Sequence, residues 1–318
     1  MDMMSSVLKQ KTLKNAISCS GVGLHTGAKV TMTIFPAKAN TGIRFKRTDI
    51  SGRQAVILAN WNNVIDSRLC STLANEDGVS IATVEHLMAA FAGLSIDNAL
   101  VEINGPEIPI MDGSAAPFAF LIECAGISEL KATRMAIKIT KPVEARDTNR
   151  FAALIPADTF AIRFDIEFPS PAVASQSHVV ELADGAFKKE VARARTFGFE
   201  HEVAALRAAG LLLGGSLDNA VVVSGDKVLN DSGLRYANEF VRHKILDSIG
   251  DLYLAGMPII GQFHGSRSGH AMNHQLLTTL FDTPDAYEVV PMQALQPRTS
   301  PSVEGFEPAF PQLAAARA

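Results

Sequence analysis

The sequence predicts an α+β protein built from two modules, in each of which strands precede helices. Segments with the period of strands come first, helical patterns follow, and this order occurs twice along the chain. Strands and helices do not alternate one by one, as they would in a βαβ fold. The length of 318 residues suits two domains of ordinary size.

In the first module, residues 29–35 alternate apolar and polar side chains, which is the period of a strand with one buried face. Residues 98–103 are expected to form a second short strand, and a loop rich in glycine, proline and aspartate follows it. A helix is expected near residues 114–125, with Ser114 as its N-cap.

The second module is expected to begin near residue 130, where polar, poorly periodic sequence gives way to a strand at residues 135–139. Further strands are expected at residues 151–155 and 160–168, and a glycine-rich interruption precedes another at residues 220–224. The predicted domains are therefore residues 1–130 and 131–282. Proline, alanine and glutamine dominate residues 283–318, which we expect to be a loosely held tail.

Composition excludes several classes of protein. The formal net charge of -4 and the pI near 6.1 argue against a nucleic acid partner, because binding to duplex phosphates needs a broad basic face. No stretch approaches the roughly 18 uninterrupted apolar residues of a membrane-spanning helix, and the first residues lack the apolar core of a signal peptide. The three cysteines have no CxxC spacing, which is typical of a reducing compartment. We expect a cytoplasmic protein without stable membrane insertion.

The first stretch with catalytic residue types is a helix predicted from about Thr83 to Gly93. Its apolar residues recur every three or four positions and form one stripe: Val84, Leu87, Met88 and Phe91. His86 lies about 200° from the start of that stripe, among alanines that would let another element approach closely. The alternative is an exposed pair of Glu85 and His86 on a solvated face.

The second stretch is a long helix that is expected to end at Gly256 and to place His243 and Asp247 one turn apart, opposite its apolar stripe. Two side chains with this spacing are able to bind one metal ion. Asp251 lies one further turn along, and Gly250 beside it leaves space for another element. The alternative is a solvated polar face with a weak histidine–aspartate pair worth about 0.3 kcal/mol.

The third stretch, FHGSRSGHAMNHQLL, places His270 at the start of a helix after a flexible loop. His274 lies one turn later, so these two histidines form a rival metal pair. An ordinary surface histidine is the favoured interpretation of His274.

Two histidines and one carboxylate leave one coordination position free, which distinguishes a catalytic zinc site from a structural one. Zinc lowers the pKa of water at that position to about 7, and Glu85 beside His86 is suited to accept the proton. The same ligand types bind iron in oxygenases, so they do not fix the metal. The helical His-xxx-Asp spacing and the adjacent carboxylate favour a hydrolase over an iron enzyme.

Six blocks of the sequence together resemble the UDP-3-O-acyl-N-acetylglucosamine deacetylases of lipid A biosynthesis: TVEHLMAA, INGPEIPIMDGSAAPF, ARTFGF, GLLLGGSLDNAVV, NEFVRHKILDSIGDLYL and SGHAMNH. The resemblance runs from about Lys9 to about Phe281. It implies zinc-dependent hydrolysis of the N-acetyl group of UDP-3-O-acyl-N-acetylglucosamine, which gives UDP-3-O-acyl-glucosamine and acetate in the committed step of the pathway. It also implies two similar domains of sheet layered with helices, packed face to face with the active site between them.

The resemblance further implies a role for individual residues. Glu85 would be the general base, His270 would protonate the leaving nitrogen with support from Asp251, and the hydroxyl of Thr196 would help to hold the tetrahedral oxyanion. The ligands of Zn²⁺, with Fe²⁺ as the alternative ion, would be His86, His243 and Asp247.

For the substrate, the resemblance implies contacts from Lys244 and Phe197. Arg267 stands where relatives have a lysine that faces the nucleotide phosphates, which keeps the charge but changes the donor geometry. Each domain would carry an insert, near residues 48–71 and 191–227. The second insert would form an apolar passage for the acyl chain, and residues that either line it or belong to ordinary core are Val203, Leu212, Leu217 and Val222.

Three features are open at this point. His25 in GVGLHTG either reaches the substrate or has a structural role in its glycine-rich turn. Cys70 matches a cysteine that lies near the metal in relatives, and we assign it no catalytic role. The terminal residues PQLAAARA resemble tails through which some relatives are recognised by a protease, with a frayed end as the alternative.

A different metal enzyme, such as a peptidase or an iron oxygenase, and a binding module without catalysis are the remaining alternatives. The presence of Glu85, Asp251 and His270 together argues against the loss of catalysis.

Overall fold

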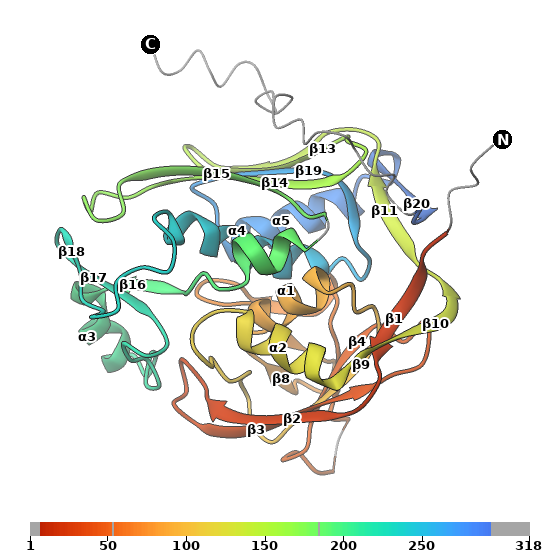
Figure 1. The fold of residues 1–318 in the computed structure, drawn as a ribbon, viewed down its shortest axis with the longest axis horizontal. Coiled ribbons are helices and arrows are strands. Elements are labelled where there is room, and N and C mark those ends of the chain that lie inside the picture. Colours follow the sequence, from red (N-terminus) through yellow and green to blue (C-terminus); the bar gives the residue numbers. More distant parts are fainter. Residues whose placement is uncertain (1–6, 53, 184, 294–318) are drawn as a thin grey trace.

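The computed structural model describes residues 7–52, 54–183 and 185–293 (Figure 1). Two sheets form the outer layers, and the main helices lie between them, with α1 and α2 next to one sheet and α4 and α5 next to the other (Figure 1). This arrangement confirms the predicted α+β class with face-to-face layers. Among the described residues, no helix combines the length and the apolar character needed to cross a membrane.

The N-terminal sheet has five strands in the order β2-β3-β9-β4-β5. Their bounds are β2 (Ile17–Val22), β3 (Lys29–Pro36), β4 (Ile43–Arg47), β5 (Val56–Leu58) and β9 (Ala99–Ile103). In β3, Val30, Met32 and Ile34 are buried and alternate with more exposed residues, as the sequence pattern predicts. The predicted strands at residues 29–35 and 98–103 are both confirmed within one residue.

The helices of this layer are α1 (Glu85–Gly93) and α2 (Ala116–Ala125), and both begin two residues later than predicted. Thr83 has a φ of 60°, which is left-handed and incompatible with a first helical turn. Ser114 is not the N-cap of α2, a position that Ala115 occupies. The Ser114 hydroxyl donates to Asp112 Oδ1 at 2.7 Å and accepts the Ala116 N–H at 3.3 Å, so it still satisfies one free donor of the helix.

The C-terminal sheet has seven strands in the order β12-β13-β19-β11-β20, with β14 paired to β19 and β15 paired to β14. Their bounds are β11 (Met135–Ile139), β12 (Val143–Arg146), β13 (Phe151–Ile155), β14 (Phe160–Glu167), β15 (Ser175–Glu181), β19 (Ile259–Ser266) and β20 (Tyr287–Pro291). The helices against it are α4 (Glu239–Tyr253) and α5 (His270–Phe281). Short helical turns are η1 (Trp61–Asn63), η2 (Phe187–Val191) and η3 (Pro284–Ala286).

Two predicted irregular segments are strands. The polar stretch around residue 130 is β10 (Ile127–Thr133), which pairs antiparallel with β1 (Lys9–Leu13) and buries none of its residues fully. Its stability comes from main-chain pairing, so it has no apolar period. Because β10 pairs with an N-terminal strand and β11 belongs to the C-terminal sheet, we propose Arg134 as the domain boundary.

The expected loose tail does not begin at residue 283, because β20 pairs antiparallel with β11 along its whole length. Main-chain hydrogen bonds along the sheet edge hold this strand, although its side chains are largely exposed. The rest of the predicted tail, including PQLAAARA, lies outside the described residues.

Two small sheets stand near the predicted inserts. The first contains β6 (Val64–Asp66), β7 (Thr72–Ala74) and β8 (Ser80–Ile81) and so continues beyond residue 71. The second contains β16 (Phe197–Phe199), β17 (Val221–Ser224) and β18 (Lys227–Val228), with α3 (Glu200–Ala208) between its first two strands. We propose these two small sheets as the inserts.

Helices α1 and α4 cross very closely at Gly250. A Cβ atom at this position would lie 2.0 Å from the main-chain oxygen of Glu85, so any larger residue would push the helices apart. Every residue of α1 from Glu85 to Phe91 is buried. The alternative of a solvated face is therefore wrong for Glu85 and His86, and also for His243 and Asp247, which are buried on α4.

Candidate active site

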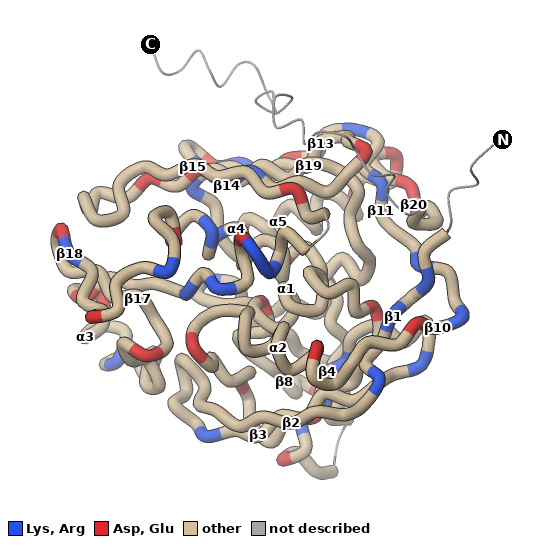
Figure 2. Tube along the Cα trace, viewed as in Figure 1, with Lys and Arg blue, Asp and Glu red and all other residues tan. Residues whose placement is uncertain are grey.

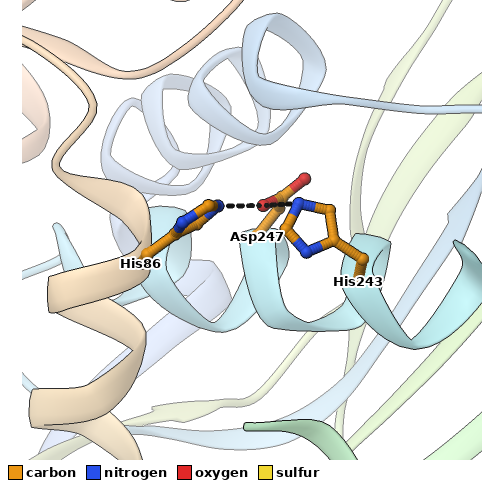
Figure 3. A group of neighbouring side chains, drawn as sticks. All are labelled: His86, His243 and Asp247. Carbon is orange, nitrogen blue, oxygen red and sulfur yellow. Dashed lines mark ion pairs between the residues drawn. The ribbon is translucent and has the colours of Figure 1, made fainter. Parts of the chain in front are cut away.

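Three buried side chains from α1 and α4 converge on one point (Figure 3). One ligand atom from each of His86, His243 and Asp247 lies within 4.8 Å of the other two. Asp247 Oδ1 is 3.2 Å from His243 Nε2 and 3.5 Å from His86 Nε2. The three residues that the sequence predicts as a metal site are thus brought together.

The donor set fits a divalent cation. Asp247 Oδ1 is buried and accepts no hydrogen bond from the described residues, which is costly unless a cation lies beside it. His243 Nδ1 donates to the carbonyl of Ala194 at 3.0 Å, which leaves the Nε2 lone pair directed into the site. Burial lowers the pKa of His243 to about 4, so the ring is neutral and able to bind a metal.

The rival pair of His270 and His274 is wrong. His274 Nε2 donates to the carbonyl of Trp61 at 3.0 Å, and this histidine is half-buried rather than an ordinary surface residue. The first site is the only group of three or more histidine, cysteine or carboxylate side chains with metal-binding spacing in the part of the chain that the structure describes.

Glu85 lies beside the three converging side chains without being one of them. Its side chain is buried, and its Oε1 is 3.9 Å from His270 Nε2. Burial raises the pKa of Glu85, while the nearby His270 and His86 act in the opposite direction. A raised carboxyl pKa is suited to a general base that works near neutral pH.

His270 faces the same point from the first turn of α5. Its Nε2 is 3.9 Å from Asp247 Oδ2, and its Nδ1 donates to Asp251 Oδ2 at 2.8 Å. Burial alone would lower the pKa of His270, but the charges of Asp251 and Glu85 raise it to about 10. The ring is therefore protonated at neutral pH, with Nε2–H available as a donor.

The start of β16 lies along the first turns of α4. Phe197 meets the His243 ring edge to face at a centroid distance of 6.4 Å, and Lys244 Nζ is 5.9 Å from the centre of the Phe197 ring. Lys244 Nζ also donates to Asp247 Oδ2 at 3.1 Å. Thr196 is held by its main chain, whose N–H donates to Gly113 O at 2.8 Å. Phe197 and Lys244 therefore lie beside the candidate metal ligands, and Thr196 directly precedes Phe197 in the chain.

A sequence profile of the UDP-3-O-acyl N-acetylglycosamine deacetylase family matches residues 10–282. The chain belongs to this family. The UDP-3-O-acyl-N-acetylglucosamine deacetylase of Acidithiobacillus ferrooxidans is 54% identical over 286 residues, which cover 89% of this chain and 93% of the relative. The deacetylase of Shewanella halifaxensis is 50% identical over 283 residues, which cover 88% and 92%. That of Methylococcus capsulatus is 50% identical over 286 residues, which cover 89% and 93%.

The predicted resemblance to the UDP-3-O-acyl N-acetylglycosamine deacetylase family is thereby confirmed. Arg267 follows β19, is exposed and forms an ion pair with Glu167. The four residues predicted either as a passage or as core belong to the second small sheet and its connections, and none of them is buried: Val203, Leu212, Leu217 and Val222. Their interpretation as ordinary core is wrong.

A second buried cluster in this deacetylase-family chain surrounds His25, whose two ring nitrogens have no hydrogen-bond partner among the described residues. Burial lowers the pKa of His25, and the charge of His270 adds to this effect. Glu107 accepts the main-chain N–H groups of His25 at 2.9 Å and Thr26 at 2.8 Å, and the Thr83 hydroxyl at 3.0 Å. Glu107 thus holds the turn at His25 close to the start of α1. In the sequence, the only sign of this role is the glycine- and proline-rich loop that contains Glu107.

Cys70 lies close to the site, but its thiol is unreactive. Burial and the charge of Glu85 raise the pKa of its thiol to about 12, so the sulfur stays protonated at neutral pH. A protonated thiol is a poor nucleophile and metal ligand. This agrees with the absence of a catalytic role for Cys70 in the deacetylase assignment.

Proposed function

We propose that this chain is a metal-dependent amidohydrolase that removes the N-acetyl group of UDP-3-O-acyl-N-acetylglucosamine. The products are UDP-3-O-acyl-glucosamine and acetate, in the committed step of lipid A biosynthesis. The observation that carries the proposal is the buried convergence of His86, His243 and Asp247, with Glu85 and His270 on its border. Relatives at about half identity are named UDP-3-O-acyl-N-acetylglucosamine deacetylases, which supports this substrate.

We propose Zn²⁺ as the ion held by the three side chains, with Fe²⁺ as the alternative, because two imidazoles and one carboxylate are a common catalytic zinc set. A bound Zn²⁺ supplies Lewis acidity and makes hydroxide available from water near neutral pH. The hydrogen bond to the Ala194 carbonyl fixes the orientation of the His243 ring. Asp247 Oδ1 has no hydrogen-bond partner among the described residues and lies close to both histidine rings.

Glu85 and His270 divide the proton transfers between them. Attack by water forms a C–O bond at the acetyl carbon and releases one proton, which the Glu85 carboxylate accepts. The C–N bond then breaks, and His270 Nε2–H protonates the sugar nitrogen as it leaves. Asp251 keeps the His270 ring oriented by accepting the Nδ1–H at 2.8 Å. The hydroxyl of Thr196 is proposed to donate to the developing oxyanion.

Basic side chains of this chain suit the sugar nucleotide of the substrate, and apolar side chains suit its acyl chain. Lys244 lies one residue from the ligand His243, and we propose that it and Arg267 bind the polar sugar nucleotide, with Phe197 beside them. We propose that incompletely buried apolar residues of the second small sheet, of α3 and of the connection between them contact the acyl chain, as their partial exposure supports: Val203, Leu212, Leu217 and Val222.

We further propose that the protein acts in the cytoplasm, since Cys19, Cys70 and Cys124 are all free thiols. Basic and acidic positions are interspersed along the outer strands, so phosphate binding would depend on local side chains rather than on a broad basic face (Figure 2). Recognition of the C-terminal tail by a protease stays a prediction.

Acetate release from UDP-3-O-acyl-N-acetylglucosamine, measured with and without a chelator over several acyl lengths, tests the proposed function. The metal-loaded protein is expected to release acetate, to lose this activity when the ion is removed and to regain it with Zn²⁺. Parallel loading with Fe²⁺ shows whether the alternative ion also supports turnover. A metal-loaded protein that releases no acetate would contradict the deacetylase function, and full activity after verified metal removal would contradict the role of the ion.

A further inference from the structure

Ser71 lies outside the three helices that carry Glu85, Asp251 and His270. It directly precedes β7 in the small sheet of β6, β7 and β8, and it is only 3% exposed. Its carbonyl accepts the N–H of Val84 at 3.3 Å, which ties this strand to the residue before α1. Ser71 therefore links the first small sheet to the interior of the site.

The two polar donors of Ser71 serve two different carboxylates. Its main-chain N–H donates to Glu85 Oε2 at 3.0 Å, and its hydroxyl donates to Asp251 Oδ1 at 2.6 Å. One residue thus contacts both the proposed base and the carboxylate that orients the proposed acid.

The hydroxyl has a specific place in the bonding of Asp251. Oδ2 of this carboxylate accepts His270 Nδ1–H at 2.8 Å and Asn273 Nδ2–H at 2.9 Å. Oδ1 accepts only the Ser71 hydroxyl within the described part of the chain. Without that donor, one oxygen of a buried carboxylate loses its partner, and the group is free to turn and to change how it holds His270.

We propose that Ser71 is a positioning residue for the deacetylation reaction, which acts through Asp251 on His270 and fixes Glu85 in the same arrangement. This inference rests on the proposed function. The carboxylates of Glu85 and Asp251 are both buried, and Ser71 donates one hydrogen bond to each of them. These two bonds keep the proposed base at a fixed position relative to the carboxylate that orients the proposed acid. Ser71 itself neither binds the ion nor exchanges a proton with the substrate.

The experiment compares Ser71→Ala with Ser71→Thr, which keeps the hydroxyl. Ser71→Ala is expected to lower kcat by about 10- to 100-fold, the usual effect of removing a partner behind a catalytic group, with KM, metal content and Tm close to those of the unmodified protein. Ser71→Thr is expected to restore most of kcat. The matched control is Thr12→Val on β1. It removes another buried hydroxyl, which accepts the Ala37 N–H at 2.9 Å, and it is expected to leave kcat unchanged.

A double substitution tests whether Ser71 acts through its proposed partner. In an Asp251→Ala background, Ser71→Ala is expected to change kcat by less than about two-fold, because coupled residues are not additive. Effects that multiply would overturn the inference, as would a folded Ser71→Ala protein with full kcat or a folded Ser71→Thr protein as slow as Ser71→Ala. An unmodified, metal-loaded protein without acetate release would instead overturn the proposed function, so the two failures are distinguishable.

Discussion

The variant Glu85→Ala is expected to keep its metal ion and to lose about two to four orders of magnitude in turnover, the usual contribution of a positioned acid or base. Glu85 lies next to the proposed ligand His86 but does not belong to the group of three converging donors. Its carboxylate is buried, and burial raises its pKa towards the range of an effective base. Acetate release at saturating substrate, measured together with the metal content per chain, checks the expectation.

Glu85→Gln is the matched variant. The amide keeps the size of the side chain and is still able to accept the Ser71 N–H, but it is unable to take a proton. A similar loss in both variants assigns the effect to proton transfer rather than to packing. Unchanged turnover in either metal-loaded variant would refute the role of Glu85 as the base.

The variant His243→Ala is expected to lose the metal and, with it, the activity. His243 supplies one of three donors, and its removal leaves Asp247 and His86 as an incomplete site. Loss of a group behind a metal ligand typically weakens binding by about 10- to 100-fold, so loss of a ligand itself is expected to exceed about 100-fold. Metal content after dialysis and the affinity for added Zn²⁺ are the measurements.

His274→Ala is the control for this experiment, because His274 is a histidine of the rival pair and its ring donates to the carbonyl of Trp61 instead of facing the three candidate ligands. It is expected to keep full metal occupancy. Full occupancy of His243→Ala, or metal loss from His274→Ala alone, would contradict the assignment of the site.

The helices of the site were predictable because their apolar residues recur with a clear period. What periodicity left open was whether the polar sides of α1 and α4 face solvent or each other. Gly250 allows the two helices to face each other, because it has no side chain and α4 is therefore able to contact the main chain of Glu85. No local pattern contains a contact between segments so far apart in the sequence. The alanines near His86 and Gly250 indicated only that another element could approach, and the resemblance to a family pointed to the shared site.

Other features gave no signal that sequence reasoning could use. Strands β10 and β20 are held by main-chain pairing at positions that are exposed or half-buried, so they lack a buried apolar stripe. Thr196 was identified by resemblance alone. Ser71 is a single small residue before a three-residue strand, and its importance lies in two hydrogen bonds to groups on other elements.

The most direct test of the account is to locate the ion by anomalous diffraction at the zinc edge in crystals of the zinc-loaded protein. The predicted result is one strong peak per chain, about 2.0 to 2.2 Å from one atom each of His86, His243 and Asp247. A peak bound by other side chains, or one that leaves any of these three unbound, would contradict the central claim.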